Sequence, residues 1–198
     1  ASYERMSQGG GMGAVSATTG LGAMGAVPQG SGGNGDLFSL IDRTEGGGRY
    51  DTLFGHAQSG GRFDGTDVSK MTLAQLYDFT SPNGEYGQWV KGHVGRVATP
   101  LGRHQIVGTT LRNAAQAMGL SPDTVFSPQV QDSMAAHLAR NRLSSAKDQA
   151  SKRAALRAEW EGFKNVSDAD LDAAIVKFEA GGGLIGNRPM GAYGKGPQ

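Results

Sequence analysis

The uneven distribution of glycine constrains this chain more than any other feature of its sequence. Of its 33 glycines, 11 fall in residues 1–35 and 7 in residues 181–198. Residues 7–35 also contain no charged and no aromatic side chain. Such a segment has too little apolar surface to offset the entropy lost on ordering. We therefore predict a flexible arm over 1–35, a folded domain over 36–181 and a flexible tail over 182–198.

The composition argues against several classes of protein. A length of 198 residues leaves room for one domain of ordinary size with a real core. The formal net charge of +1 gives no general reason to expect a nucleic acid or an anionic membrane as partner. Without cysteine the chain has no disulfide, no thiolate zinc site and no cysteine nucleophile. Its sequence shows no long apolar run and no signal-peptide pattern, so we expect no transmembrane segment.

The middle of the chain has the apolar spacing and the capping residues of helices. Helices are expected to begin at Asp36, Thr72, Thr109 or Thr110, Ser127, residue 149, and Ser167 or Asp168. Residues 46–69 are rich in glycine and aspartate, which is typical of a loop or a small hairpin. The expected fold class is therefore mainly α (α+β), with a small irregular or β-hairpin lobe after the first helix.

One acidic residue stands at an electrostatically unfavourable place. Glu45 ends the first expected helix, where the partial negative charge of the helix terminus disfavours an anion. Apolar neighbours such as Phe38 and Ile41 should raise the pKa of its carboxyl further. A carboxyl that stays protonated near neutral pH can act as a general acid. The ordinary alternative is a solvated surface residue.

A second polar motif follows about sixty residues later. In "TPLGRHQIVGTTL", residues 99–111, a turn with Pro100 and Gly102 precedes Arg103, His104 and Gln105. A glutamine here can both donate and accept hydrogen bonds to a polar ligand, without adding charge beside an acid.

Together the two motifs resemble the lysozyme-like lytic transglycosylases, most closely the phage lambda endolysin type. In that family a glutamate closes the first long helix and a "G-R-Y-Q" segment lines the glycan cleft. The segment "FSPQVQDSMAAHLARNRL", residues 126–143, resembles the family's "F-S-P…Q-D" helix, and Trp160 resembles the tryptophan of its penultimate helix. The resemblance covers about residues 37–180. The lobe at 46–98 departs from the lambda pattern, and His104 stands where tyrosine is more usual.

The resemblance implies cleavage of the β-1,4 bond between N-acetylmuramic acid and N-acetylglucosamine in peptidoglycan. Glu45 would act first as acid and then as base toward the C6 hydroxyl, leaving 1,6-anhydro-muramic ends. It further implies an enzyme of the periplasm or cell wall, either phage-encoded, virion-associated or exported by a bacterium. The residues expected to contact the glycan are Gln105, Arg103, His104, Gly102, Tyr50 and Phe54.

A hydrolytic muramidase is the nearest alternative. It needs a second carboxylate roughly 5 to 9.5 Å from the first. Asp51, Asp64 and Asp67 are available, but aspartate in a glycine-rich loop is expected as a turn former.

A non-catalytic alternative is a glycan-binding or structural part of a phage particle or secretion assembly, with the glycine-rich arm as its tether. A third alternative, nucleic-acid binding through the basic stretch at 140–157, competes with a simpler interpretation as a solvated helix face. The four histidines lack the spacing of a zinc site, so neither a metal nor another cofactor is expected.

Overall fold

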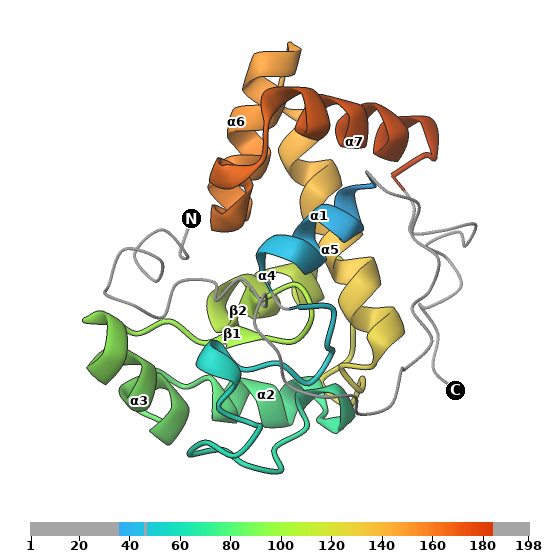
Figure 1. Ribbon diagram of the computed structural model, residues 1–198. Helices are drawn as coiled ribbons and strands as arrows, with labels where there is room; N and C mark the ends of the chain where they lie inside the picture. The colour runs from blue at the N-terminus through green and yellow to red at the C-terminus, as the bar shows by residue number, and fades with distance from the viewer. Residues whose placement is uncertain (1–35, 46, 184–198) are drawn as a thin grey trace, which may run out of the picture.

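The computed structural model of the chain describes residues 36–45 and 47–183 (Figure 1). The described part is mainly helical, as expected, and carries one small antiparallel sheet. Its α-helices are α1 (Leu37–Thr44), α2 (Leu73–Phe79), α3 (Glu85–Val94), α4 (Gly108–Ala117), α5 (Pro128–Ser144), α6 (Gln149–Glu159) and α7 (Asp168–Ala180). Short 3-10 helices are η1 (Phe54–His56), η2 (Val68–Lys70) and η3 (Glu161–Asn165), and the strands are β1 (Pro100–Leu101) and β2 (Ile106–Val107). The predicted arm over 1–35 and nearly all of the predicted tail lie outside the described residues.

Side-chain caps explain where several of the helices begin. The carboxylate of Asp36 accepts a hydrogen bond from the backbone N–H of Ser39 at 2.7 Å and so caps α1. Thr72 and Gln75 form a reciprocal capping box at the start of α2. Ser127 caps α5, whose first residue is a proline. These three starts, and that of α7 at Ser167, confirm the predicted positions.

Two helices differ from the sequence-based expectation. The third expected helix begins at Gly108, slightly before Thr109, because Val107 in the sheet leads straight into it. The helix expected over 149–162 ends at Glu159, and a 3-10 turn continues the chain. Both differences are confined to the ends of the helices.

The lobe after α1 contains a helix that the sequence pattern did not predict. Helix α3 includes Gly87 and Gly92, and glycine has a low helix propensity. Tertiary packing compensates, because Tyr86 is fully buried and Trp89 packs against the same core. Residues 47–69 form turns and 3-10 helices, with a single isolated bridge from Leu53 to Leu101, and the small hairpin lies instead at 100–107.

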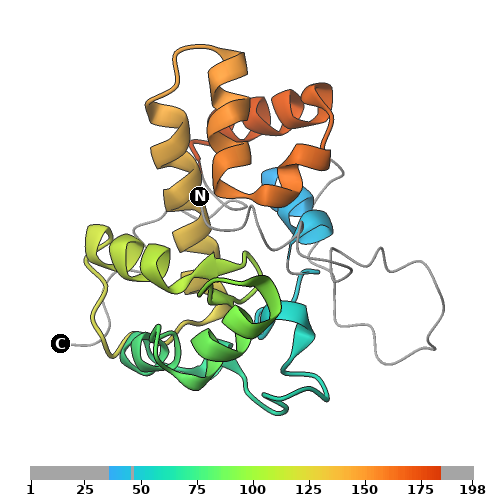
Figure 2. The ribbon, with the colours of Figure 1, turned by 90° about the vertical axis from the view of Figure 1, so that its left-hand side faces the viewer.

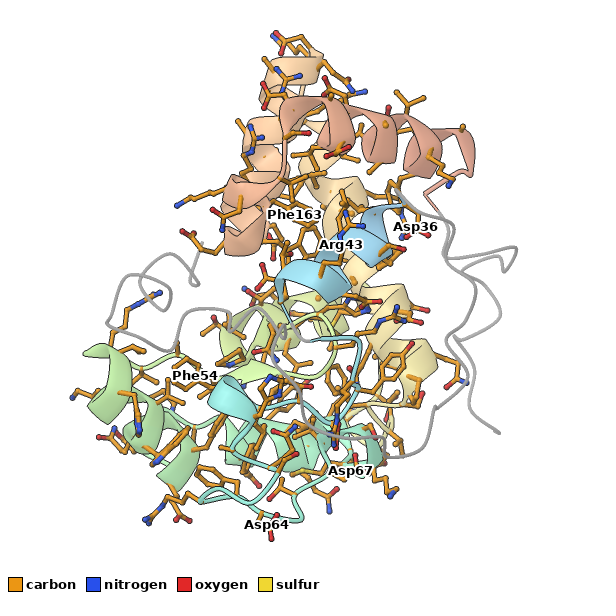
Figure 3. All side chains as sticks on the ribbon, in the orientation of Figure 1. Asp36, Arg43, Phe54, Asp64, Asp67 and Phe163 are labelled. Atoms are coloured by element: carbon orange, nitrogen blue, oxygen red, sulfur yellow. The ribbon has the colours of Figure 1, made fainter. Side chains whose placement is uncertain are left out.

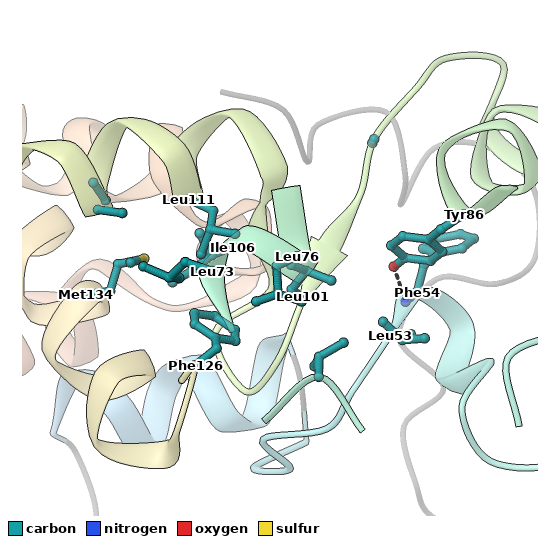
Figure 4. Close-up of a cluster of buried hydrophobic side chains, with 14 of the residues drawn as sticks. Leu53, Phe54, Leu73, Leu76, Tyr86, Leu101, Ile106, Leu111, Phe126 and Met134 are labelled. Carbon is teal, nitrogen blue, oxygen red and sulfur yellow. Dashed lines mark hydrogen bonds between the residues drawn. The ribbon is translucent and has the colours of Figure 1, made fainter. Parts of the chain in front are cut away.

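Helix α5 connects two hydrophobic cores. Its first half contributes Val130 and Met134 to the core of the lobe that contains α2, α3 and α4 (Figure 4). Its second half contributes Ala139 and Leu143 to a core shared with α1, α6, η3 and α7. Figures 1 and 2 accordingly show α5 running from one group of helices to the other. Helix α1 therefore belongs to the second group of helices, whereas the chain contributes to the core of the first group from Leu53 onward.

The basic side chains of α5 and α6 are largely engaged in ion pairs. Arg142 binds Glu159 at 2.7 Å, and Arg153 binds Asp172 of α7 at the same distance. Lys152 and Arg157 bind Glu179 and Asp168, respectively. These pairs link α6 to its two neighbours and offset the positive charge of the stretch. Over the described ranges, no helix is long and apolar enough to cross a membrane.

Candidate active site

Glu45 lies at the junction between α1 and η3. Its backbone N–H donates to the carbonyl oxygen of Ile41 at 2.8 Å and completes the last turn of α1. Its side-chain Oε1 accepts a hydrogen bond from the backbone N–H of Gly162 at 2.8 Å. The other oxygen, Oε2, is buried and has no hydrogen-bond partner among the described residues. One oxygen of the carboxyl is therefore held by a hydrogen bond, and the other is shielded from water.

This environment raises the pKa of the Glu45 carboxyl from its ordinary 4.5 to about 8. Desolvation by burial is the main cause, because removing water penalises the charged form. The hydrogen bond from Gly162 acts in the opposite direction, and the charge of Glu161 raises the pKa further. The residue as a whole is partly exposed, but the buried Oε2 atom supports the direction of the shift. Glu45 is therefore protonated in the folded chain at neutral pH.

The raised pKa has a consequence for stability. In the unfolded chain the carboxyl ionises near pH 4.5, whereas the folded chain keeps the proton until about pH 8. The contribution of the neutral acid to stability is therefore complete below pH 4.5 and is lost as the pH rises toward 8. We expect Glu45→Gln to be more stable than wild type by roughly 3–5 kcal/mol at pH 8, and equally stable at pH 4. Urea denaturation across this range measures the difference, and a gap that is independent of pH would contradict the expectation.

The turn between β1 and β2 carries four of the other predicted site residues, from Gly102 to Gln105. Gln105 is buried and adopts a positive φ of 48°, which is uncommon for a residue other than glycine. Its Nε2 donates to the carbonyl oxygen of Gly102 at 2.8 Å and, more weakly, to that of Thr52 at 3.4 Å. The side-chain amide thus shapes the turn and joins it to the segment that follows α1.

Arg103 connects this turn to α1. Its Nε donates to Oδ1 of Asp42 at 2.6 Å, and Nη2 binds the second oxygen of the same carboxylate. Its Nη1 donates to the hydroxyl of Tyr50 at 2.6 Å, and the guanidinium lies 5.2 Å from the centre of the Tyr50 ring. A two-pronged pair of this kind fixes geometry as well as charge. Because Asp42 lies three residues before Glu45, Arg103 braces the last turn of the helix that carries the acid.

His104 and Tyr50 share a carboxylate on α5. His104 is buried, and its Nε2 lies 2.7 Å from Oδ1 of Asp132. The hydroxyl of Tyr50 donates to Oδ2 of Asp132 at 2.9 Å. Burial, with the negative charge of Asp132 next, raises the pKa of Tyr50 to about 12, so its hydroxyl keeps the proton that it donates. Asp42, Arg103, Tyr50, Asp132 and His104 therefore form one continuous polar network.

Gly102 allows the turn to approach α5 closely. It has a φ of 69°, and a Cβ placed on it would lie 2.1 Å from Oε1 of Gln131. That same oxygen accepts a hydrogen bond from the backbone N–H of Arg103 at 3.0 Å. Nε2 of Gln131 donates to the carbonyl oxygens of Tyr50 and Phe126. Gln131 thus joins three segments that are far apart in the sequence.

The turn and Glu45 meet the same short segment of the chain. Trp160 donates from its indole N–H to the carbonyl oxygen of His104 at 3.3 Å, and Gly162, two residues later, donates to Glu45. Trp160 is buried, as expected for a core aromatic residue. Residues 160–162 therefore bring together the two motifs that the sequence analysis singled out.

Phe54 has a different environment from the other predicted site residues. Its side chain is buried in the core of the first lobe, where its ring centre lies 6.0 Å from that of Trp89 (Figures 3 and 4). Its backbone N–H donates to the hydroxyl of Tyr86 at 2.9 Å. In this position the ring offers little surface to a ligand, and its proposed contact with glycan remains a prediction.

The three aspartates considered as second carboxylates have local partners. Asp51 binds Arg49 at 2.6 Å. Asp64 accepts a hydrogen bond from the N–H of Gly60, and Asp67 accepts one from the N–H of Ser69. In Figure 3, Asp64 and Asp67 lie in the lower part of the lobe, on the side away from α1. The expectation that Asp64 and Asp67 form turns is confirmed.

Five residues of the site were not assigned a role from the sequence: Asp42, Gln131, Asp132, Glu161 and Gly162. The "Q-D" pair at 131–132 was visible as a motif, but its partners were not. No cluster of three or more potential metal ligands occurs within the described part of the chain. Comparisons of the chain with protein-family models, curated proteins and solved structures found no match.

Proposed function

We propose that this chain is a lysozyme-like lytic transglycosylase that cleaves the β-1,4 bond between N-acetylmuramic acid and N-acetylglucosamine in peptidoglycan. The observation that carries the proposal is the carboxyl of Glu45, which stays protonated near neutral pH in a desolvated position at the end of α1. Breaking a glycosidic bond requires such an acid to protonate the leaving oxygen. The resemblance of the two sequence motifs to that family supplies the substrate class.

The proposed reaction uses one carboxyl twice. The Glu45 acid gives its proton to the glycosidic oxygen, and the N-acetylglucosamine side departs with a new hydroxyl group. The resulting carboxylate accepts the proton of the muramic C6 hydroxyl as that oxygen bonds to C1. This step forms the 1,6-anhydro ring and restores the neutral acid, so no water is consumed. The local partners of Asp51, Asp64 and Asp67 favour this single-carboxyl route over hydrolysis.

The products distinguish the proposal from its alternatives. Purified peptidoglycan would be digested with the full chain, and the soluble fragments would be analysed by mass spectrometry. We expect muramic ends lighter by one water molecule than reducing ends, as the 1,6-anhydro form requires. Reducing ends alone would show a hydrolytic muramidase. Absence of soluble fragments would favour a glycan-binding or structural protein.

The proposal also predicts the alkaline limb of the pH profile. Glu45 must carry its proton in the free enzyme, so kcat/KM should fall as the pH rises through its pKa of about 8. Above that pH we expect a loss of about tenfold per pH unit. Initial rates on solubilised glycan strands between pH 5 and 10 measure the limb. A midpoint near the ordinary glutamate value of 4.5 would contradict the assignment of Glu45 as the acid.

A further inference from the structure

The start of η3 makes an unusually close approach to the end of α1. A Cβ placed on Gly162 would lie 2.4 Å from Cβ of Thr44 and 2.7 Å from its carbonyl oxygen. Only glycine therefore fits at this contact without displacing backbone. This close approach is what brings the N–H of Gly162 within 2.8 Å of Oε1 of Glu45.

The residue before Gly162 is a buried acid. The side chain of Glu161 is 8% exposed and pairs with Nζ of Lys164 at 2.7 Å, whereas the Lys164 side chain is 40% exposed. Burying a carboxylate is costly, and a partly solvated lysine compensates for only part of that cost. A negative charge at this place disfavours a second one on Glu45 and thereby favours its protonated form.

Other charged side chains lie on α1 and at the end of α6, and arginines bind the two carboxylates among them. On α1, Asp42 is bound by Arg103, and Arg43 is exposed. At the end of α6, Glu159 is bound by Arg142 at 2.7 Å. Glu161 differs from these residues because the backbone N–H of the next residue, Gly162, donates a hydrogen bond to the carboxyl of Glu45.

We propose that Glu161 and Gly162 are positioning residues for Glu45: the N–H of Gly162 orients its carboxyl, and the buried charge of Glu161 helps it to keep its proton. The Glu161–Lys164 pair then regulates the acid, because any change in the charge balance of this pair alters the protonation of Glu45. Any effect of this pair on catalysis rests on the proposed glycan cleavage, whereas its effect on the protonation of Glu45 does not.

The test compares two glutamates whose side chains are shielded to a similar degree. The side chains of Glu161 and Glu159 are 8% and 9% exposed, and each pairs at 2.7 Å with a cation that is 40% exposed. The full-length chain with ¹³C-labelled glutamate carboxyls would be titrated by NMR, with Glu45→Gln used to assign the signal. We expect Glu161→Gln to make Glu45 about three- to tenfold more acidic. Glu159→Gln should leave its midpoint unchanged.

A second variant changes the same pair in the opposite direction. Lys164→Gln leaves the charge of Glu161 uncompensated, so the Glu45 midpoint should move to higher pH. The lysine is partly exposed, so this variant should fold even if Glu161→Gln does not. An unmoved midpoint in Lys164→Gln, or an equal shift in Glu159→Gln, would overturn the proposal. If the Glu45 midpoints shift as expected but the wild-type chain cleaves no peptidoglycan, the proposed function is contradicted and the positioning role is not.

Gly162→Ala tests the orienting role separately. The added methyl group must displace η3 from α1 and weaken the hydrogen bond to Glu45. We expect kcat to fall at least tenfold with little change in KM, because orientation acts on the reacting group. Gly92→Ala is the control, since a Cβ at that helical position meets nothing within 4 Å. Equal kcat values for the two variants would contradict an orienting role for Gly162.

Discussion

Glu45→Gln is expected to reduce the rate of peptidoglycan cleavage by about 10²- to 10⁴-fold while the fold is retained. Glutamine has the same shape as glutamate, and its carbonyl oxygen can still accept the hydrogen bond from Gly162. It has no acidic proton to give to the leaving oxygen. Release of soluble fragments from labelled peptidoglycan measures the rate, and circular dichroism verifies the fold.

The matched control for this variant is Glu159→Gln. Glu159 is a largely shielded glutamate two residues before Glu161, and its carboxylate is bound by Arg142. We expect its replacement to leave the rate within about twofold after correction for any loss of folded protein. If Glu45→Gln keeps more than about a tenth of the wild-type rate, another group must supply the proton, and the single-carboxyl mechanism fails.

Local signals in the sequence were sufficient to predict the helix that carries the acid. Asp36 caps α1, its apolar residues face the core, and Glu45 follows its last turn as expected. The electrostatic argument from the helix end also gave the correct direction for the pKa of Glu45. The dominant cause is nevertheless burial. That burial involves Gly162, which lies 117 residues further along the chain and belongs to no pattern around Glu45.

The turn at 102–105 shows a different limit of prediction from sequence. Its glycine and its position ahead of a helix were readable, and its polar side chains were interpreted as ligands for sugar, but the two strands that flank it were not predicted. In the structure Arg103 binds Asp42, and His104 binds Asp132. A sequence pattern gives the residue types at a turn, but their partners depend on contacts across 61 and 28 residues. The burial of Phe54 could not be predicted for the same reason, because its core neighbour Trp89 lies on the helix that was not predicted.

Arg103→Met is expected to lower the free energy of unfolding by about 2–4 kcal/mol, which corresponds to a fall in Tm of roughly 5–15 °C. Methionine keeps most of the apolar stem but removes the charge. Asp42 then loses the partner that holds both of its oxygens, and the hydroxyl of Tyr50 loses a donor. Because the side chains of Arg103 and Asp42 are only 21% and 25% exposed, water cannot fully replace these bonds. Urea denaturation at pH 7 measures the loss.

Arg49→Met is the control that shows how much of the stability loss in Arg103→Met is due to the burial of its ion pair. Arg49 also binds an aspartate, Asp51, with a shortest distance of 2.6 Å, but its side chain is 56% exposed. Solvent screening should limit the loss for this pair to less than about 1 kcal/mol. Asp42→Asn should cost about as much as Arg103→Met, and the double variant little more than either, because both remove the same interaction. Equal losses for Arg49→Met and Arg103→Met would mean that the network does not brace α1, and that the last turn before Glu45 is held by its apolar packing alone.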